Sequence, residues 1–161
     1  MELQLTQEIN APAKKVWEVL AHQFAEISEW APNIESSRAI EMSEVPTGFK
    51  VAENAPVPGR VTPNPLGDVT EVLTEYSEEK KSFTFEVAGP APLFSHTANT
   101  TKVVEQDTDK SIVTFDLQLS PKGIFNLFSP LLKRRFQTSK FGPAGMIRDL
   151  KNYVENNYWR E

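Results

Sequence analysis

The sequence contains no cysteine and no apolar run of about 18 residues or more. The absence of cysteine excludes disulfides, thiolate nucleophiles and cysteine-ligated zinc sites. The absence of a long apolar run argues against a membrane-spanning helix. The first residues, MELQLTQEI, include two glutamates and lack the basic start of a secretory signal. We therefore predict no stable membrane insertion and a cytoplasmic location.

Basic residues and histidines are also scarce. The chain has 17 Lys and Arg against 22 Asp and Glu, so its formal net charge is -5, and only two histidines are present. An acidic balance disfavours a polyanionic partner, so we predict no nucleic-acid binding. No glycine-rich phosphate loop occurs. A single histidine without a neighbouring second ligand is weak evidence for a metal site, and we expect neither a metal nor a cofactor.

The chain nevertheless has enough apolar residues for a sizeable core. Its 161 residues are 39% hydrophobic and 10% aromatic, which fits one domain over residues 1–161. Nothing in the composition indicates the oligomeric state.

The first third of the sequence predicts one strand followed by two short helices. Leu3, Leu5 and Ile9 fall on odd positions with mostly polar residues between them, which is typical of a half-buried strand. A helical stripe with steps of three and four residues follows, and Pro32 ends it. The stripe consists of Ala13, Val16, Trp17, Leu20 and Phe24, and a second short helix extends it through Ile27 and Trp30.

The remainder predicts an antiparallel meander and a C-terminal helix. Turn-forming residues separate four strand-like runs, from Asp68 to Tyr76, Lys81 to Val87, His96 to Gln106 and Lys110 to Ser120. A helix from Leu131 to Asn157 would be about 40 Å long. Pro143, in the sequence GPAG, cannot donate a hydrogen bond to the Ser139 carbonyl, so we expect a kink or break there.

This order of elements resembles the START-like, or SRPBCC, superfamily. The superfamily includes polyketide cyclases, lipid-transfer domains, birch-pollen-type allergens and plant abscisic acid receptors. The similarity covers nearly the whole chain and depends on three stretches and their order. They are EINAPAKKVWEVLAHQFAEISEWAPNIESS, GDVTEVLTEYSEEKKSFTFEVAGPAP and a C-terminal helix with LLKRRF and MIRDLKNYVE.

The resemblance implies an α+β helix-grip fold. A seven-stranded antiparallel sheet would wrap around a long C-terminal helix, with two short helices after the first strand. A cavity of about several hundred cubic ångströms would lie between sheet and helix. Trp17 and Trp30 would anchor the short helices at one end, although Trp30 also fits an ordinary core position. The alternative to a cavity is that the same side chains pack together without a void.

The resemblance and the strand alternation together predict the residues that contact a ligand. Glu71 is the candidate polar group and the only candidate for catalysis, although alternation leaves open which face of its strand is inside. Arg60, Lys102 and Asp116 are further candidates, although each fits a solvated strand position better than a pocket position. The predicted ligand-binding residues are Glu71, Phe83, Phe85, Val87, His96, Phe115, Leu117, Phe136, Met146, Ile147 and Leu150.

Two loops resemble the gate and latch of the abscisic acid receptors. The first, in TPNPLGDVTE, contains Asn64, Pro65 and Leu66, and the second, in VAGPAPLFSHT, contains Pro90, Pro92 and Leu93. We predict that both border the mouth of the cavity, although proline and glycine also suit ordinary turns. The receptors' signature gate and latch residues are missing, and Ala31 stands where their ligand-anchoring lysine is expected. A receptor for a carboxylic acid hormone is therefore disfavoured.

Two functions agree with these features. The first is binding or transport of a hydrophobic small molecule or lipid, without covalent chemistry. The second is a polyketide cyclase or dehydratase activity, which needs only acid and base groups in a shaped cavity. We favour binding; a third possibility is an accessory domain that binds a partner protein.

Overall fold

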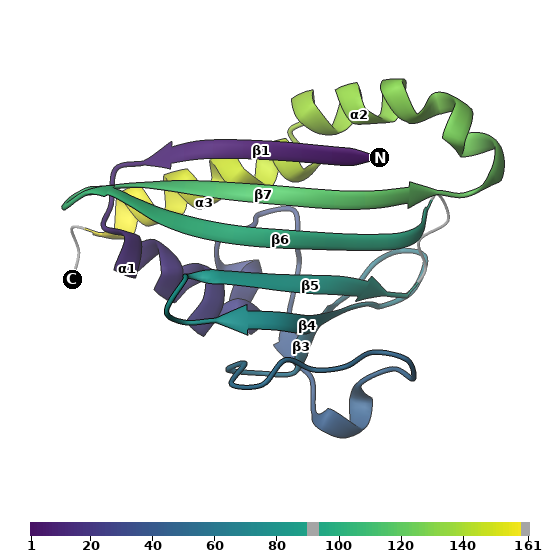
Figure 1. Ribbon diagram of the computed structural model, residues 1–161, viewed down its shortest axis with the longest axis horizontal. Coiled ribbons are helices and arrows are strands. Elements are labelled where there is room, and N and C mark those ends of the chain that lie inside the picture. Colours follow the sequence, from purple (N-terminus) through teal and green to yellow (C-terminus); the bar gives the residue numbers. More distant parts are fainter. Residues whose placement is uncertain (90–93, 159–161) are drawn as a thin grey trace.

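The structure, a computed structural model, describes residues 1–89 and 94–158. Its centre is one antiparallel sheet of seven strands in the order β1-β7-β6-β5-β4-β3-β2 (Figure 1). The strands are β1 (Glu2–Ile9), β2 (Arg38–Ala39), β3 (Gly59–Thr62), β4 (Val69–Ser77), β5 (Ser82–Ala88), β6 (Phe94–Asp107) and β7 (Lys110–Pro121).

Helical segments follow β1, β2 and β7. The helices are α1 (Ala13–Trp17), the π-helical turn η1 (Glu18–His22), the 3-10 segments η2 (Phe24–Glu29), η3 (Met42–Glu44) and η4 (Gly123–Phe128), α2 (Ser129–Thr138) and α3 (Pro143–Tyr158). In Figure 1, α3 crosses behind the sheet, whereas α2 lies beyond β1 at the top of the view. The α+β helix-grip prediction is confirmed, and so are the short helices after the first strand.

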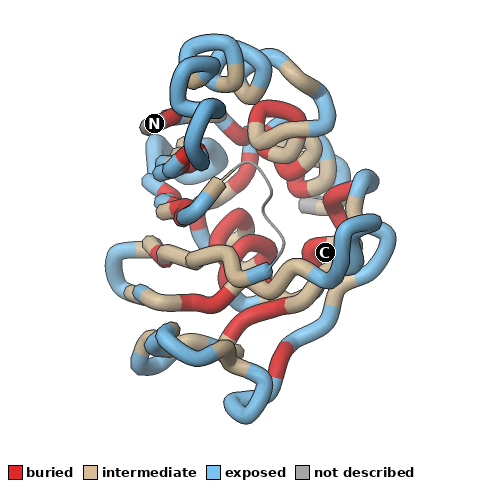
Figure 2. The backbone as a smooth tube through the Cα atoms, turned by 90° about the vertical axis from the view of Figure 1, so that its right-hand side faces the viewer, coloured by how far each residue is buried: buried red, intermediate tan, exposed pale blue. Residues whose placement is uncertain are grey.

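The core lies between the sheet, the first helical segments and α3. The apolar stripe predicted from Ala13 to Trp30 is buried, and Trp17 is 1% exposed. Its ring lies 5.6 Å from Tyr76 and 5.8 Å from Phe83, measured between ring centroids. Figure 2 shows buried residues in the interior and an exposed periphery. Burial of this aromatic stripe therefore fixes the short helices against β4 and β5.

The C-terminal helix has the break expected at GPAG. It is divided into α2 and α3, because Ser139 has an extended backbone with φ -70° and ψ 133°. Pro143 is the first residue of α3, where its missing N–H would have no helical partner in any case. A Cβ on Gly145 would lie 1.9 Å from the Lys140 carbonyl oxygen, so the turn packs directly against α3. Only α3, about 24 Å long, spans the sheet.

Candidate ligand pocket

A cavity of about 160 Å³ lies between the inner face of the sheet and the helices η1, η2 and α3. This is smaller than the several hundred cubic ångströms expected from the sequence. Its wall is formed by Leu20, Ile27, Trp30, Arg60, Glu71, Phe83, Phe85, Val87, Thr97, Asn99, Thr101, Phe115, Leu117, Pro143 and Met146. Most of these side chains are apolar or aromatic, and five have a polar group.

Cross-strand pairing arranges the sheet side of the wall in rows. Partners in neighbouring antiparallel strands lie opposite one another on the same face. The first row contains Arg60, Glu71 and Val87, the second contains Leu73, Phe85, Asn99 and Leu117, and the third contains Tyr76, Phe83, Thr101 and Phe115. Each row thus brings at least one polar group to the inner face of the sheet.

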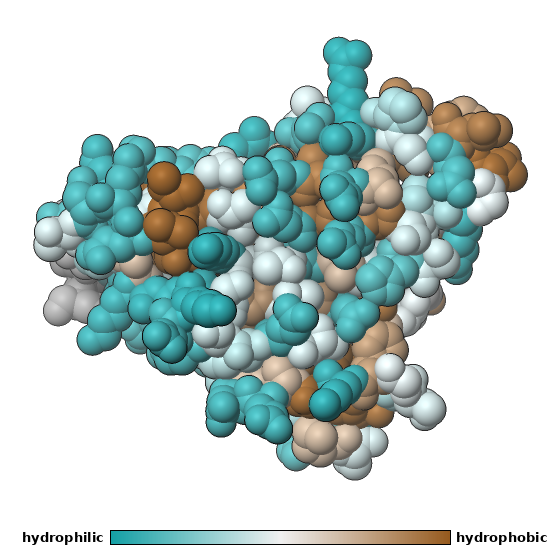
Figure 3. Space-filling model, in the orientation of Figure 1, coloured by the Kyte–Doolittle hydropathy of each residue, from teal (hydrophilic) through white to brown (hydrophobic). Residues whose placement is uncertain are grey.

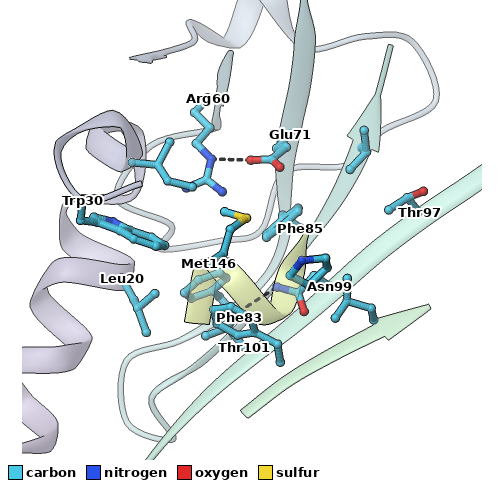
Figure 4. A pocket seen from close by; sticks show the side chains of 15 residues that line it. Leu20, Trp30, Arg60, Glu71, Phe83, Phe85, Thr97, Asn99, Thr101 and Met146 are labelled. Atoms are coloured by element: carbon cyan, nitrogen blue, oxygen red, sulfur yellow. Dashed lines mark hydrogen bonds and ion pairs between the residues drawn. The ribbon is translucent and has the colours of Figure 1, made fainter. Parts of the chain in front are cut away.

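An ion pair forms the polar part of the first row. Arg60 and Glu71 pair across β3 and β4, and the Arg60 Nε–H donates a hydrogen bond to the Glu71 carboxylate (Figure 4). A second guanidinium N–H donates to the Phe24 carbonyl at 2.8 Å. The guanidinium carbon lies 4.0 Å from the centroid of the Phe24 ring. Arg60 is only 5% exposed, so the pair places two opposite charges in a largely apolar wall.

The glycine that precedes Arg60 allows this pair to form. A Cβ on Gly59 would lie 2.1 Å from the Glu71 carbonyl oxygen and 3.0 Å from the Val72 Cα. No other residue fits so close to a neighbouring backbone without displacing a strand. Gly59 therefore sets the separation of β3 and β4 at the pocket.

A buried amide forms the second polar group. Asn99 is 6% exposed, and its Nδ2 donates to the Thr101 hydroxyl at 3.1 Å. Its Oδ1 has no hydrogen-bond partner among the residues that the structure describes. Figure 4 shows Asn99 and Thr101 on the opposite side of the pocket from Arg60 and Glu71, with Met146 between the two pairs. A buried carbonyl-type oxygen without a partner is costly, and a ligand with a donor would satisfy it.

Seven of the residues predicted to bind a ligand lie in the wall. They are Glu71, Phe83, Phe85, Val87, Phe115, Leu117 and Met146. Alternation could not decide which face of β4 is inside, and the inner face is the one that carries Glu71. That these side chains contact a ligand stays a prediction.

His96 does not lie in the wall. It is exposed on the outer face of β6, where its Nε2 lies 2.8 Å from a carboxylate oxygen of Glu86. The inner face of β6 carries Thr97, Asn99 and Thr101 instead. The expectation that His96 points into the cavity is wrong, because the odd-numbered residues of this strand face inward.

Three predicted helical residues also lie outside the wall. Ile147 and Leu150 are 4% and 0% exposed and belong to the hydrophobic core beside α1, whereas Pro143 and Met146 face the pocket from α3. Phe136 lies on α2, which the break carries away from the sheet's inner face. Its ring packs against Phe94 with a centroid distance of 5.9 Å.

The two predicted mouth loops give different outcomes. Asn64, Pro65 and Leu66 are exposed in the connection between β3 and β4, and none of them lines the pocket. Pro90, Pro92 and Leu93 lie outside the described residues. A role of either loop in ligand entry stays a prediction.

Sequence reasoning missed Thr97, Asn99 and Thr101 of the pocket's polar residues, and it ranked Arg60 below Glu71. Arg60 lies in the short strand β3, where alternation has too few residues to decide which face is inside. The available signal was its position opposite Glu71, which requires the register of β3 and β4. Trp30 was expected either to anchor the short helices at one end of the cavity or to occupy an ordinary core position. It is 7% exposed and lies in the pocket wall.

The comparison with protein families gives one match to nearly the whole chain. The model described as polyketide cyclase / dehydrase and lipid transport matches residues 1–155. No match to this sequence is found among curated proteins.

Several solved structures have the same fold. A START superfamily protein from Mycobacterium smegmatis is 12% identical with a TM-score of 0.67, covering 99% of this chain and 97% of that one. A protein from Thermobifida fusca is 18% identical with a TM-score of 0.69, covering 96% and 93%. Norcoclaurine synthase from Thalictrum flavum, in complex with dopamine and hydroxybenzaldehyde, is 14% identical with a TM-score of 0.68, covering 97% and 87%.

Proposed function

The chain belongs to the polyketide cyclase / dehydrase and lipid transport family, and from this membership we propose that its pocket binds a compact hydrophobic molecule with a hydrogen-bond donor. One observation carries the proposal. The pocket is largely apolar, yet the buried Asn99 Oδ1 in its wall lacks a partner among the described residues. Binding sites for small molecules commonly combine an apolar wall with a few polar groups that fix orientation.

The size of the pocket limits the part of the ligand that it encloses. A dry cavity of about 150 Å³ lined by aliphatic and aromatic side chains accommodates benzene. The 160 Å³ pocket therefore suits a single ring or a short branched chain. A larger molecule, such as a lipid, would bury only one segment there.

The polar groups favour a hydroxyl or an amine on that segment. Asn99 Oδ1 accepts a hydrogen bond from either group, while the Glu71 carboxylate is already paired with Arg60. A structurally similar protein, norcoclaurine synthase, is known in complex with dopamine and hydroxybenzaldehyde, both of which are single-ring aromatic molecules. This supports the same size and chemistry of ligand here.

Cyclisation, the alternative function, receives less support from the pocket. It requires a group that transfers a proton, and Glu71 was the candidate. Arg60 donates a hydrogen bond to the Glu71 carboxylate and neutralises its charge, which suits a fixed structural pair. We therefore favour binding without chemistry.

Phenol and toluene are suitable probes because they differ by a hydroxyl and a methyl on the same ring. We expect phenol to bind more tightly to the parent protein, since its hydroxyl donates to Asn99 Oδ1. Asn99→Leu keeps a similar volume and removes the acceptor, so the preference for phenol should fall about two- to tenfold. Chemical-shift titration of isotope-labelled protein measures both affinities.

A cavity-filling variant tests the location. Thr97→Phe adds a ring to the inner face of β6 and should abolish binding of both probes. His96→Phe adds a similar ring on the outer face of the same strand and serves as the control. Unchanged binding in Thr97→Phe would contradict the proposal.

A further inference from the structure

Exposed apolar side chains gather in the connection between β7 and α3. Of the nine large hydrophobic residues exposed among those described, six lie between residues 124 and 141. They are Ile124, Phe125, Leu127, Phe128, Leu131 and Phe141, and Leu127 is 82% exposed. Figure 3 shows hydrophobic atoms gathered at the upper right, the part of the view where η4 leads into α2 in Figure 1. Contiguous exposed apolar surface of this kind marks an interaction site more often than single exposed residues do.

The same stretch has a charge opposite to that of the rest of the protein. Residues 117–148 contain no Asp or Glu but include six Lys and Arg. The other residues contain 11 Lys and Arg against all 22 Asp and Glu, which gives them a formal charge of -11. The chain as a whole is acidic at -5, so this segment is a local basic region on an acidic protein.

Packing holds the segment on one side only. Neither η4 nor α2 has a buried residue. Leu132 and Phe136 are half-buried, and the Phe136 ring contacts Phe94 of β6. Leu131, Arg134 and Arg135 are exposed, and neither arginine forms an ion pair within residues 1–89 and 94–158. The apolar and basic side chains are therefore both available to a partner.

We propose that this region binds an anionic lipid membrane. We call it the docking surface, and it consists of Ile124, Leu127, Phe128, Leu131, Lys133, Arg134 and Arg135. Leucine and phenylalanine beside lysine and arginine match the boundary between acyl chains and anionic headgroups. No helix of the described residues is long and apolar enough to cross a membrane, so the contact is interfacial. A protruding surface with basic side chains suits a bilayer better than it suits a protein groove.

The docking surface lies outside the pocket wall and supplies a function beyond ligand binding. A protein held at a membrane by this surface would have access to hydrophobic molecules dissolved there. Membrane docking is tested with vesicles alone, without a pocket ligand. Its failure would therefore leave the pocket proposal standing.

Flotation with vesicles tests the docking surface directly. We expect the parent protein to float with vesicles of equal parts phosphatidylcholine and phosphatidylglycerol, and to bind much less to phosphatidylcholine alone. High salt should weaken the binding because it screens the charges. Arg134→Gln combined with Arg135→Gln should reduce partitioning about thirtyfold. Each basic residue near an anionic membrane strengthens binding about five- to sixfold, and the variant removes two. Leu127→Ser should reduce it about tenfold or more.

Matched controls separate the surface from general effects. Lys50→Gln combined with Lys80→Gln removes the same charge from exposed positions outside the docking surface. Met42→Ser removes a side chain that is 63% exposed on η3, which follows β2 at the opposite edge of the sheet from β1. Both controls should float like the parent.

Four results would overturn the proposal. One is no flotation of the parent with anionic vesicles, and another is equal losses in the control variants. The third is self-association of the parent that Leu127→Ser abolishes, measured by sedimentation without lipid. That result would assign the surface to a second copy of the chain. Capture of an acidic protein in the absence of vesicle binding would likewise replace the membrane by a protein partner.

Discussion

The chain contains two helical regions rich in apolar residues, and the structure uses them differently. In α1, η1 and η2, the apolar stripe from Ala13 to Ile27 packs against the sheet and is buried. In η4 and α2, no residue is buried, and the apolar residues Ile124, Leu127 and Leu131 are exposed. Apolar residues in a helical region therefore contribute to folding only where they pack against the sheet.

Contacts with the sheet account for the difference. Phe24 on η2 contacts Phe83, Phe85 and the Arg60 guanidinium, which links this helical region to β3 and β5. The α2 helix lies beyond β1, the edge strand, and outside the inner face of the sheet (Figure 1). The first region closes the pocket, whereas the second offers its apolar side chains to the surroundings.

A pair of phenylalanine substitutions gives the largest expected contrast. Phe24→Ala removes a ring that is 1% exposed and should lower the free energy of unfolding by about 3 to 5 kcal/mol. Phe141→Ala removes a ring that is 70% exposed, next to α2, and should change it by less than about 0.5 kcal/mol. Urea unfolding followed by tryptophan fluorescence measures both. Similar losses would contradict the division between the two regions.

Glycine substitutions test how each helical region is joined to the rest. Gly59→Ala places a Cβ against the β4 backbone and should cost about 3 kcal/mol, at the upper end for an overpacked site. It should also displace Arg60, which donates to the Phe24 carbonyl. Gly142→Ala, beside Phe136 of α2, meets no atom closer than 3.6 Å and is the tolerated control. Thermal unfolding compares the two, and a stable Gly59→Ala protein would show that β3 can shift freely.

The ion pair at the pocket gives a smaller effect. Glu71→Gln leaves the buried Arg60 guanidinium without its carboxylate and should cost about 1.5 to 3 kcal/mol, as expected for a charged hydrogen bond. The control is Glu86→Gln, whose partner His96 lies on the outer face, and an exposed pair is worth about 1 kcal/mol or less. Equal losses in urea unfolding would show that Arg60 is satisfied without Glu71.

Most of the sheet could be predicted from alternation and turns. The four runs predicted between Asp68 and Ser120 correspond to β4, β5, β6 and β7 with small differences at their ends. The apolar helical stripe of the first region was predicted for the same reason, because each side chain in it faces the core. Family resemblance supplied the remaining step, which is the wrapping of the sheet around the C-terminal helix.

The inner face of β6 could not be predicted because it depends on one register shift. Asp107 pairs with Lys110, and continuing that register would place even-numbered residues of β6 opposite odd-numbered residues of β7. The register shifts between Glu105 and Asp107, so Asn99 instead pairs with Leu117. A shift of one residue exchanges the faces of a strand, which brings Asn99 inward and His96 outward. Alternation within a strand contains no information on such a shift.

The position of α2 depends on contacts rather than on periodicity. Apolar residues continue at helical spacing from Leu132 to Val154, and only GPAG predicts a break within that stretch. The extended backbone of Ser139 and the close approach of Gly145 to Lys140 divide it. Neither feature changes the apolar spacing on either side, so GPAG predicts the break but the apolar pattern cannot give the position of α2.

The smallest expected effect concerns the attachment of α3, the helix that stays on the sheet. The Glu155 carboxylate accepts hydrogen bonds from the Asn10 backbone N–H at 2.8 Å and from Lys151 Nζ at 2.7 Å. Burial acts to raise the pKa of Glu155, but these hydrogen bonds outweigh it and hold the pKa below its ordinary value. The depressed pKa means that the folded state gains stability from ionised Glu155 above the ordinary glutamate range. This stability is lost as the pH falls through the lower pKa of the folded state.

Glu155→Gln should therefore lower stability by about 1 kcal/mol at neutral pH and flatten its decline in acid, whereas exposed Glu53→Gln should do neither. Urea unfolding at a series of pH values measures the slope, and an unchanged slope in Glu155→Gln would show that α3 is held by its buried apolar face alone.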